Sequence, residues 1–167
     1  AGLHLGWIDR TRSGLRAFAW LRATAGAIGL IMATLLIGSW VMRGPGVAWR
    51  PYTDGVITEA RRSGNPVIID FYADWCAPCR ELDAVTFHDA EIVKQSGRDF
   101  IMVKVDLTRK GDPVHERLLR QYGVKGVPTV VFLDREGKER QDLRLVDFLP
   151  ASRFLIRMTE AKKGVRR

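Results

Sequence analysis

Three runs of apolar, largely β-branched residues recur along the chain, at Val67–Tyr72, Phe100–Val105 and Thr129–Leu133. Polar residues hardly interrupt them, which is the pattern of strands buried on both faces of a sheet. The turn residues Asp134–Gly137 then lead to a weaker apolar segment around Leu143–Val146, which predicts an antiparallel partner strand. The pattern therefore predicts a central sheet closed by a hairpin.

The segments around these strands carry the spacing of amphipathic helices and the residues that begin and end them. The predicted helices run from Thr53 to about Ser63, from about Cys76 onward, from Asp89 to about Gln95, from Pro113 to Tyr122, and from Pro150 to about Ala161. Helices that alternate with strands, followed by a hairpin, are typical of an α/β sandwich with a mixed central sheet flanked by helices. We expect this fold for residues 52–161.

An apolar stretch of another kind precedes this region. Residues 23–42 form a run of 20 residues without a charge, bracketed by Arg22 and Arg43, with Trp20 and Trp40 near its ends. As a helix the run spans roughly 30 Å, the thickness of a bilayer's hydrocarbon core. A buried core helix and a cleaved signal peptide are the alternatives, but the run is apolar on every face and too long for a signal peptide. We predict one transmembrane helix.

Charge around this run indicates its orientation. Four arginines precede it, with Asp9 as the single acid, whereas only Arg43 and Arg50 follow it closely. The positive-inside tendency places the N-terminus in the cytoplasm and the rest of the chain outside. The predicted organisation is a cytoplasmic basic flank (1–22), a transmembrane helix (23–42), a linker (43–51), the folded domain (52–161) and a basic tail (162–167).

The net charge of +8 is not a property of the folded domain. Residues 1–50 carry +5 and residues 162–167 carry +4, whereas residues 51–161 carry −1. A nucleic-acid-binding domain holds its basic residues on the folded part, so we expect no nucleic-acid partner. The 46% of hydrophobic residues excludes a disordered chain, and two cysteines are too few for a disulfide-stapled miniprotein.

Both cysteines lie in one motif, Trp75-Cys76-Ala77-Pro78-Cys79, shortly after the first predicted strand. Two intervening residues place both thiols on the first turn of a helix, close enough to form a disulfide. Backbone N–H groups at the start of that helix stabilise a thiolate on Cys76 and lower its pKa, which favours Cys76 as the nucleophile. Cys79 is then the thiol that resolves the mixed disulfide.

Three other interpretations of the pair are weaker. Half a zinc site needs further ligands, but there is no second Cys-x-x-Cys motif, and His4, His88 and His115 show no ligand spacing, so we expect no metal. A purely structural disulfide across so short a loop removes little chain entropy. Chance pairing is the third, and the order of strand, aromatic residue, Cys-x-x-Cys and helix argues against it. We predict a redox-active Cys76–Cys79 disulfide.

The residues around the motif resemble the thioredoxin family. The resemblance covers residues 51–161 and is carried by Asp70–Arg80 (DFYADWCAPCR) and Gly126–Thr129 (GVPT). Within the family, Tyr72–Cys76 and Thr86–Asp89 are most similar to the C-terminal periplasmic domains of the DsbD-type thiol:disulfide interchange proteins, which follow a membrane helix. The resemblance implies a thioredoxin-like sandwich that takes electrons from a membrane thiol pair and passes them to periplasmic thiol proteins.

The resemblance also assigns residues beside the cysteines. Pro128, preceded by Val127, matches the family's cis-proline, which lies beside the nucleophile and shapes the substrate groove. Trp75, Ala77 and Pro78 are expected to border the same groove, with Trp75 contacting partner proteins. The pair Ala77-Pro78 is more typical of thioredoxins than of the DsbD type, so the resemblance leaves the redox potential open.

Three charged residues complete the candidate site. Asp70 ends a buried strand just before the motif, where desolvation raises the pKa of a carboxyl and allows it to accept the proton of Cys79. Lys104 stands on the adjacent strand, at the position of a family lysine that neighbours this carboxyl. Asp83 lies one helical turn after Cys79 and resembles a second family acid. We expect Asp70 and Asp83 together to keep the pKa of Cys76 higher than in strongly oxidising relatives.

These observations predict a membrane-anchored protein-disulfide reductase in the bacterial inner membrane, with its domain in the periplasm. The dithiol carries both electrons, so no cofactor is expected. One span and no further cysteine cannot relay electrons across a membrane, so the donor is a membrane-embedded cysteine pair outside this sequence. The alternatives are an anchored thioredoxin for cytochrome c maturation and a non-catalytic thioredoxin-like interaction domain.

Overall fold

The computed structural model describes residues 20, 24–38 and 44–163, in two separate units that divide after Arg43. In the first unit residues 24–38 are helical. Among the described residues, no helix combines the length and the apolar character needed to cross a membrane. The two ends of the predicted span (23 and 39–42), the basic flank apart from residue 20, and residues 164–167 of the tail lie outside the described residues.

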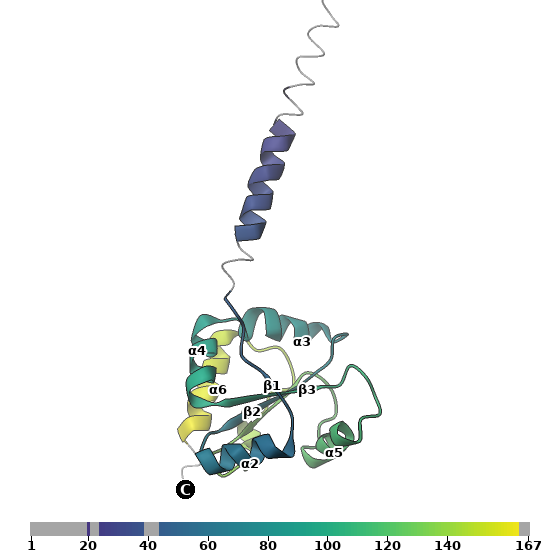
Figure 1. Cartoon of the computed structure of the whole chain (residues 1–167), viewed down its shortest axis with the longest axis vertical. Helices are drawn as coiled ribbons and strands as arrows, with labels where there is room; N and C mark the ends of the chain where they lie inside the picture. Colours follow the sequence, from purple (N-terminus) through teal and green to yellow (C-terminus); the bar gives the residue numbers. More distant parts are fainter. Residues whose placement is uncertain (1–19, 21–23, 39–43, 164–167) are drawn as a thin grey trace, which may run out of the picture. The chain divides into compact units, whose positions relative to one another are not determined.

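The second unit is built on a four-stranded sheet in the order β1-β3-β2-β4 (Figure 1). The strands are β1 (Arg50–Pro51), β2 (Val67–Tyr72), β3 (Ile101–Asp106) and β4 (Thr129–Leu133). β3 runs parallel to both β1 and β2, whereas β4 is antiparallel to β2. The mixed sheet is confirmed, and β2 lies in its interior with pairing partners on both sides.

Helices cover both faces of this sheet (Figure 1). They are α2 (Asp54–Ser63), α3 (Ala77–Glu81), α4 (Ala90–Asp99), α5 (Pro113–Gln121) and α6 (Ala151–Lys163), and α3 continues directly into a π-helical turn, η1 (Leu82–Thr86). Successive residues of β2 point to opposite faces, so Ile68 joins the core under α4 and α6 while Ile69 joins the core under α2 and α5. The uninterrupted apolar pattern of the strands follows from these two cores.

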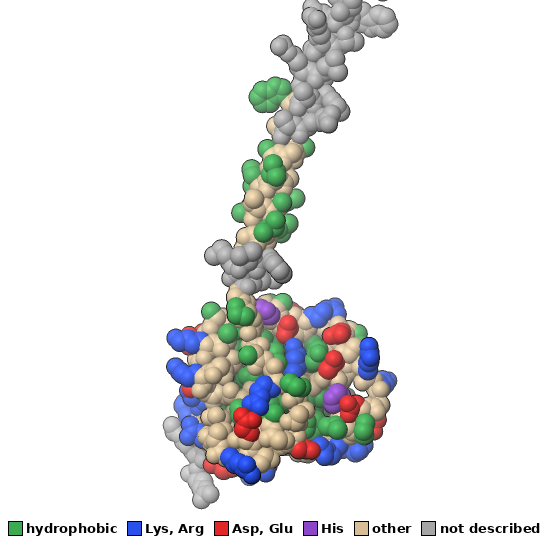
Figure 2. All heavy atoms as spheres, in the orientation of Figure 1, with side chains coloured by type: hydrophobic (Ala, Val, Ile, Leu, Met, Phe, Trp, Pro, Cys, Tyr) green, Lys and Arg blue, Asp and Glu red, His purple; other side chains and the backbone are tan. Residues whose placement is uncertain are grey.

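Most predicted helix boundaries agree with the structure to within a residue or two. α2 begins after Thr53, whose hydroxyl accepts a hydrogen bond from the Val56 N–H, and ends at Gly64 in the left-handed conformation. α4 begins after the predicted cap Asp89 but runs on to Asp99, four residues beyond the predicted end. Figure 2 shows acidic and basic side chains interspersed on the visible face of this unit, as expected from its small net charge.

The weak antiparallel partner predicted at Leu143–Val146 forms only in part, because Leu145 pairs antiparallel with Val130 but no strand forms there. This region contains a 3-10 turn (Gln141–Leu143), and its only pairing with β4 among the described residues is through isolated bridges, Val130 with Leu145 and Leu133 with Glu139. The Arg157 guanidinium on α6 donates to the carbonyls of Leu143 and Arg144 at 3.1 and 2.8 Å. The Arg157 side chain therefore binds two backbone carbonyls in the segment where a regular strand was expected.

The stretch predicted as a linker is part of the folded unit from residue 44 onward. Val47 is buried, and its N–H donates to the carbonyl of Phe87 at 2.9 Å. The Trp49 ring meets the Phe87 ring edge-on at 4.9 Å, and Arg50–Pro51 pairs with β3. Two buried or packed apolar side chains and a parallel strand thus hold this segment in the folded unit. The prediction of a linker was wrong here, because it rested on the short motif Gly-Pro-Gly.

The cap of α2 gives a first testable prediction. Replacing Thr53 with alanine leaves the Val56 N–H without its side-chain acceptor, so we expect the free energy of unfolding to fall by about 1 kcal/mol. Chemical denaturation of the full chain measures it. Thr58→Ala is the matched control, because Thr58 lies in the middle of the same helix and alanine is the better helix former there. An equal loss in both variants would contradict a specific capping role.

Candidate active site

Cys76 and Cys79 form a disulfide with an S–S distance of 2.01 Å at the start of α3. The central strand β2 ends at Tyr72, so the pair lies just beyond the carboxyl edge of the sheet. Cys76 caps the helix, and its sulfur accepts a hydrogen bond from the Cys79 N–H at 3.1 Å. Only 4% of Cys76 is exposed. In the reduced state the same N–H stabilises a thiolate on Cys76, the sulfur predicted to act as nucleophile.

The loop before β4 faces the cysteines, as the resemblance implied. The Val127–Pro128 peptide bond is cis, and Val127 packs against the small cluster that both cysteines form with Ala73. Trp75, which directly precedes Cys76, is 64% exposed. Its indole is therefore presented to solvent rather than packed beneath the thiols.

The predicted groove residues border different parts of this surface. Trp75 and Val127 line one pocket together, whereas Val127 and Pro128 line a second one on the other side of the loop. Ala77 is exposed and Pro78 half-buried on the first turn of α3. The structure thus brings Trp75 and Val127 together beside the disulfide, and their roles toward a partner stay predictions.

Asp70 is the buried acid of the site, with 3% of its surface exposed. Burial raises its pKa from the ordinary 3.8 to about 7; the positive charge of Lys104 opposes this rise, and the negative charge of Asp83 adds to it. The register of the parallel pair β2/β3 places Lys104 opposite Asp70. The desolvation expected from the sequence is therefore confirmed, and it makes Asp70 a group that exchanges a proton near neutral pH.

Lys104 bonds to Asp83 and not to Asp70. Its ammonium lies 3.0 Å from Asp83 Oδ1, and it sits 4.4 Å from the centre of the Tyr72 ring and 5.3 Å from that of Trp49. Two aromatic faces and a carboxylate together fix the ammonium beside the buried acid. Asp83 lies in the π-helical turn η1. The wider turn of a π-helix changes the direction of the side chains that follow Cys79, compared with a regular α-helix.

A pocket of about 440 Å³ connects Asp83 and Lys104 to the resolving cysteine. It is lined by Tyr72, Ala73, Asp74, Cys79, Arg80, Asp83 and Lys104. A cavity of this size can admit water beside the Cys79 sulfur, where Asp83 and Lys104 offer it polar partners. Trp49 was not foreseen as a neighbour of the site, because it lies in the segment taken for a linker and no local motif marks it.

The remaining polar groups give no indication of a bound metal. Within residues 20, 24–38 and 44–163, no group of three or more His, Cys, Asp or Glu side chains is placed to hold a metal ion. His88 is exposed, and His115 is half-buried. The absence of a cofactor stays a prediction.

Two cysteines that close a disulfide at the start of a helix can take up two electrons as a dithiol and give them back. Joined to this fold, the pair defines a thiol-disulfide oxidoreductase of the thioredoxin type. Residues 54–162 match the family model described as a thioredoxin-like domain, and the chain belongs to that family.

Among curated relatives, the chain is similar to thiol:disulfide interchange proteins DsbD. It is 38% identical over 94 residues to the protein from Photorhabdus laumondii, a match that covers 56% of this chain and 16% of the relative. It is 26% identical over 170 residues to the protein from Vibrio cholerae, which covers 93% of this chain and 28% of the relative. The chain thus spans less than a third of the length of either relative.

Solved structures show the same relationship. The C-terminal domain of Neisseria meningitidis DsbD in its oxidised form superposes with a TM-score of 0.56 and 27% identity, over 69% of this chain and 100% of that one. A thioredoxin from Thermus thermophilus gives 0.59 and 25% identity over 72% of this chain and 91% of that one. The domain is therefore related both to DsbD C-terminal domains and to thioredoxins.

Proposed function

We propose that the chain is a protein-disulfide reductase. The Cys76 thiolate attacks one sulfur of a partner disulfide, forming a mixed disulfide and releasing the other partner sulfur as a thiolate, which takes up a proton. Cys79 gives its proton to Asp70, and the resulting thiolate attacks Cys76, which closes the Cys76–Cys79 disulfide and releases the second partner sulfur as a thiolate that takes up a proton. The partner gains two electrons, and the dithiol loses two. The observation that carries this proposal is the Cys76–Cys79 disulfide at the start of α3, with the Cys79 N–H on the Cys76 sulfur, and the buried Asp70, whose pKa is raised to about 7, suits proton transfer at neutral pH.

The oxidised pair has to be reduced again, and a second dithiol is the chemically matched donor. We assign this role to a membrane-embedded cysteine pair, with periplasmic thiol-disulfide proteins as acceptors. The similarity to DsbD proteins supports the assignment, since those relatives are several times longer than this chain.

Membrane anchoring by residues 23–42 belongs to the same proposal. The 20 residues carry no charge, and in the described helical part the large apolar side chains are exposed, among them Ile28, Leu30 and Leu35. We expect the full chain to stay with the membrane fraction after alkaline washing. We also expect a membrane-impermeant thiol reagent to label reduced Cys76 from the periplasmic side of intact cells. Recovery in the soluble fraction, or labelling only after lysis, would exclude the anchor or the orientation.

Trapping of the mixed disulfide tests the catalytic step. In Cys79→Ala the attack by Cys76 proceeds but resolution cannot, so oxidised insulin should accumulate as a covalent adduct that dithiothreitol releases. Non-reducing gel electrophoresis and mass spectrometry detect the adduct. Cys76→Ala is the control and should trap little, because the remaining thiol, Cys79, lacks the backbone N–H hydrogen bond that stabilises a thiolate on Cys76. A domain that binds partners without exchange would yield no adduct in either variant, and the proposal would then fail.

A further inference from the structure

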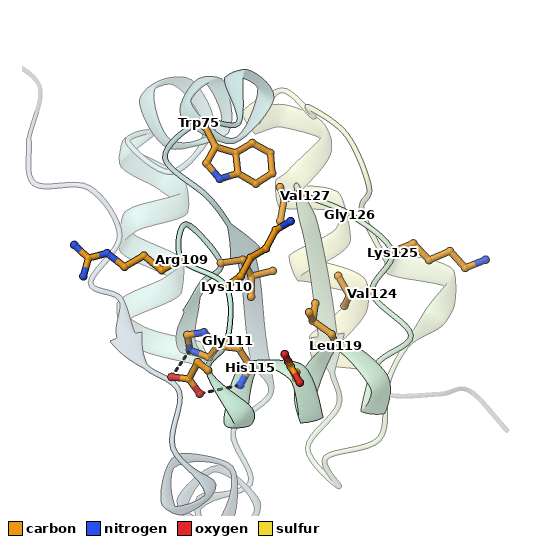
Figure 3. A pocket seen from close by; sticks show the side chains of 13 residues that line it. Trp75, Arg109, Lys110, Gly111, His115, Leu119, Val124, Lys125, Gly126 and Val127 are labelled. Carbon is orange, nitrogen blue, oxygen red and sulfur yellow. Dashed lines mark hydrogen bonds and ion pairs between the residues drawn. The ribbon is translucent and has the colours of Figure 1, made fainter.

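A pocket of about 380 Å³ opens beside the disulfide, between Trp75 and helix α5 (Figure 3). Its lining is mainly apolar. The apolar side chains that line it are those of Trp75, Leu107, Leu119, Val124 and Val127. None of the mechanism above uses Leu107, Leu119 or Val124. A concave apolar surface of this volume accommodates a side chain the size of leucine and removes it from water.

The pocket lies close to the sulfur to which a partner becomes bound. Trp75 directly precedes the nucleophile, and Val127 packs against the cluster of Ala73, Cys76 and Cys79. A partner held on Cys76 by a mixed disulfide therefore has the residues next to its own cysteine at the pocket mouth, because consecutive Cα atoms lie only about 3.8 Å apart.

Lys110 brings a positive charge to this mouth. In Figure 3 its side chain extends across the pocket toward Val127, whereas the side chains of Arg109 and Lys125 point away from the centre. In the described part of the chain, Lys110 forms no ion pair, and it is exposed. Its ammonium is thus available to a ligand.

The acids on the rim are engaged elsewhere. The Asp112 carboxylate caps α5 by accepting hydrogen bonds from the N–H groups of Val114 and His115 at 2.8 and 3.3 Å, and it also faces the His115 ring at 3.9 Å. Glu116 faces Arg120 at 3.9 Å, one helical turn away. Neither carboxylate pairs with Lys110, so its ammonium can pair with an anionic group of a ligand at the mouth.

We propose that this pocket selects partners whose reactive cysteine is flanked by an apolar residue and then by an acidic one. The apolar side chain enters the pocket, and the carboxylate pairs with Lys110. Lys110 is thus a specificity-determining residue. The inference rests on the proposed reductase function and names the kind of partner segment that the site takes.

Disulfide-linked homodimers of three blocked peptides test this selection: Glu-Leu-Cys-Leu-Glu, Lys-Leu-Cys-Leu-Lys and Glu-Ser-Cys-Ser-Glu. The reduced full chain is mixed with each dimer at low ionic strength, and chromatography follows the released peptide thiol. Every rate is divided by that of dithiothreitol on the same dimer, which removes differences in intrinsic reactivity.

For the wild type, we expect the Glu-Leu dimer to react fastest. The Ser dimer should be about tenfold slower, as loss of a buried leucine predicts. The ratio of Glu-Leu to Lys-Leu rates should fall roughly tenfold in Lys110→Glu, since exposed charge pairs contribute modest energies that a reversal turns to repulsion. The change should shrink in about 0.5 M salt, and Lys110→Arg should keep the wild-type ratio.

Arg153→Glu is the matched control. It makes the same change of charge at an exposed residue of α6 that does not line this pocket. An unchanged ratio in Lys110→Glu, an equal change in Arg153→Glu, or equal rates with the Ser dimer would overturn this inference while insulin reduction continued. Failure to reduce insulin or any dimer would instead overturn the proposed function itself.

Discussion

Replacing Asp70 with asparagine should slow the release of a trapped partner by roughly a hundredfold above pH 7 while making the folded domain more stable there. The rate falls because Cys79 loses the group that accepts its proton. Asparagine occupies the same volume but has no basic oxygen at any relevant pH. General-base removal of this kind costs at least about two orders of magnitude in rate.

The stability change has the opposite sign, and its pH window follows from the pKa of Asp70. Because the pKa is about 7 in the folded domain and near 3.8 in the unfolded chain, the folded state holds a proton that the unfolded state has released between those values. The free energy of unfolding therefore falls as the pH rises from about 4 to about 7 and stays low above that. The asparagine side chain does not ionise, so Asp70→Asn should lose this dependence and gain roughly 2 to 4 kcal/mol above pH 7.

Two measurements check these expectations. Stopped-flow decay of a preformed mixed disulfide on Cys76 gives the resolution rate, and urea unfolding from pH 4 to 9 gives the stability. Asp74→Asn is the control, because Asp74 is an exposed acid beside the same cysteine motif. If Asp70 had a merely structural role, Asp70→Asn would reduce the resolution rate and the stability together. If the pH dependence of stability did not change in Asp70→Asn, the pKa of Asp70 would not be raised in the folded domain.

The sequence correctly predicted those parts of the molecule whose structure depends on residues close together in the chain. Val67–Tyr72 is apolar at nearly every position because both of its faces are covered, so its bounds were predicted without error. The position of Asp70 within that run was sufficient to predict a raised pKa. The cysteine motif needs only its own spacing to place two sulfurs on one helical turn, and the structure confirms their disulfide.

Contacts between distant segments were not predictable in this way. Trp49 lies far before Lys104 in the chain and reaches it only because β1 pairs with β3. Lys104 forms an ion pair with Asp83, which lies in the π-helical turn η1, and no pattern of residues in the sequence predicts a π-helical turn there. The hairpin strand was predicted from the turn residues Asp134–Gly137 and a weak apolar segment, which could not show that Arg157, on a later helix, binds the carbonyls of Leu143 and Arg144.

Lys104 is expected to set the pH at which the site works. In Lys104→Met the positive charge that holds down the pKa of Asp70 is gone, so that pKa should rise above about 7. Each unit of increase removes about tenfold from the ionised fraction. We therefore expect resolution of the mixed disulfide at pH 7 to slow by roughly tenfold, a magnitude typical of losing one nearby opposite charge. Methionine is unbranched and of similar length, so it fills the space beside Tyr72 and Trp49 but lacks the ammonium that faces their rings.

The full pH profile of that rate distinguishes an electrostatic effect from damage to the fold. In Lys104→Met the profile should move to higher pH and regain the wild-type rate at its alkaline end. Asp83→Asn should move it the other way, because the negative charge of Asp83 raises the pKa of Asp70. Displacements of opposite sign from two residues that bond to each other cannot come from simple loss of their shared ion pair. Profiles that move in the same direction would show that the pair only holds η1 in place, and Lys104 would then have no part in tuning the proton acceptor.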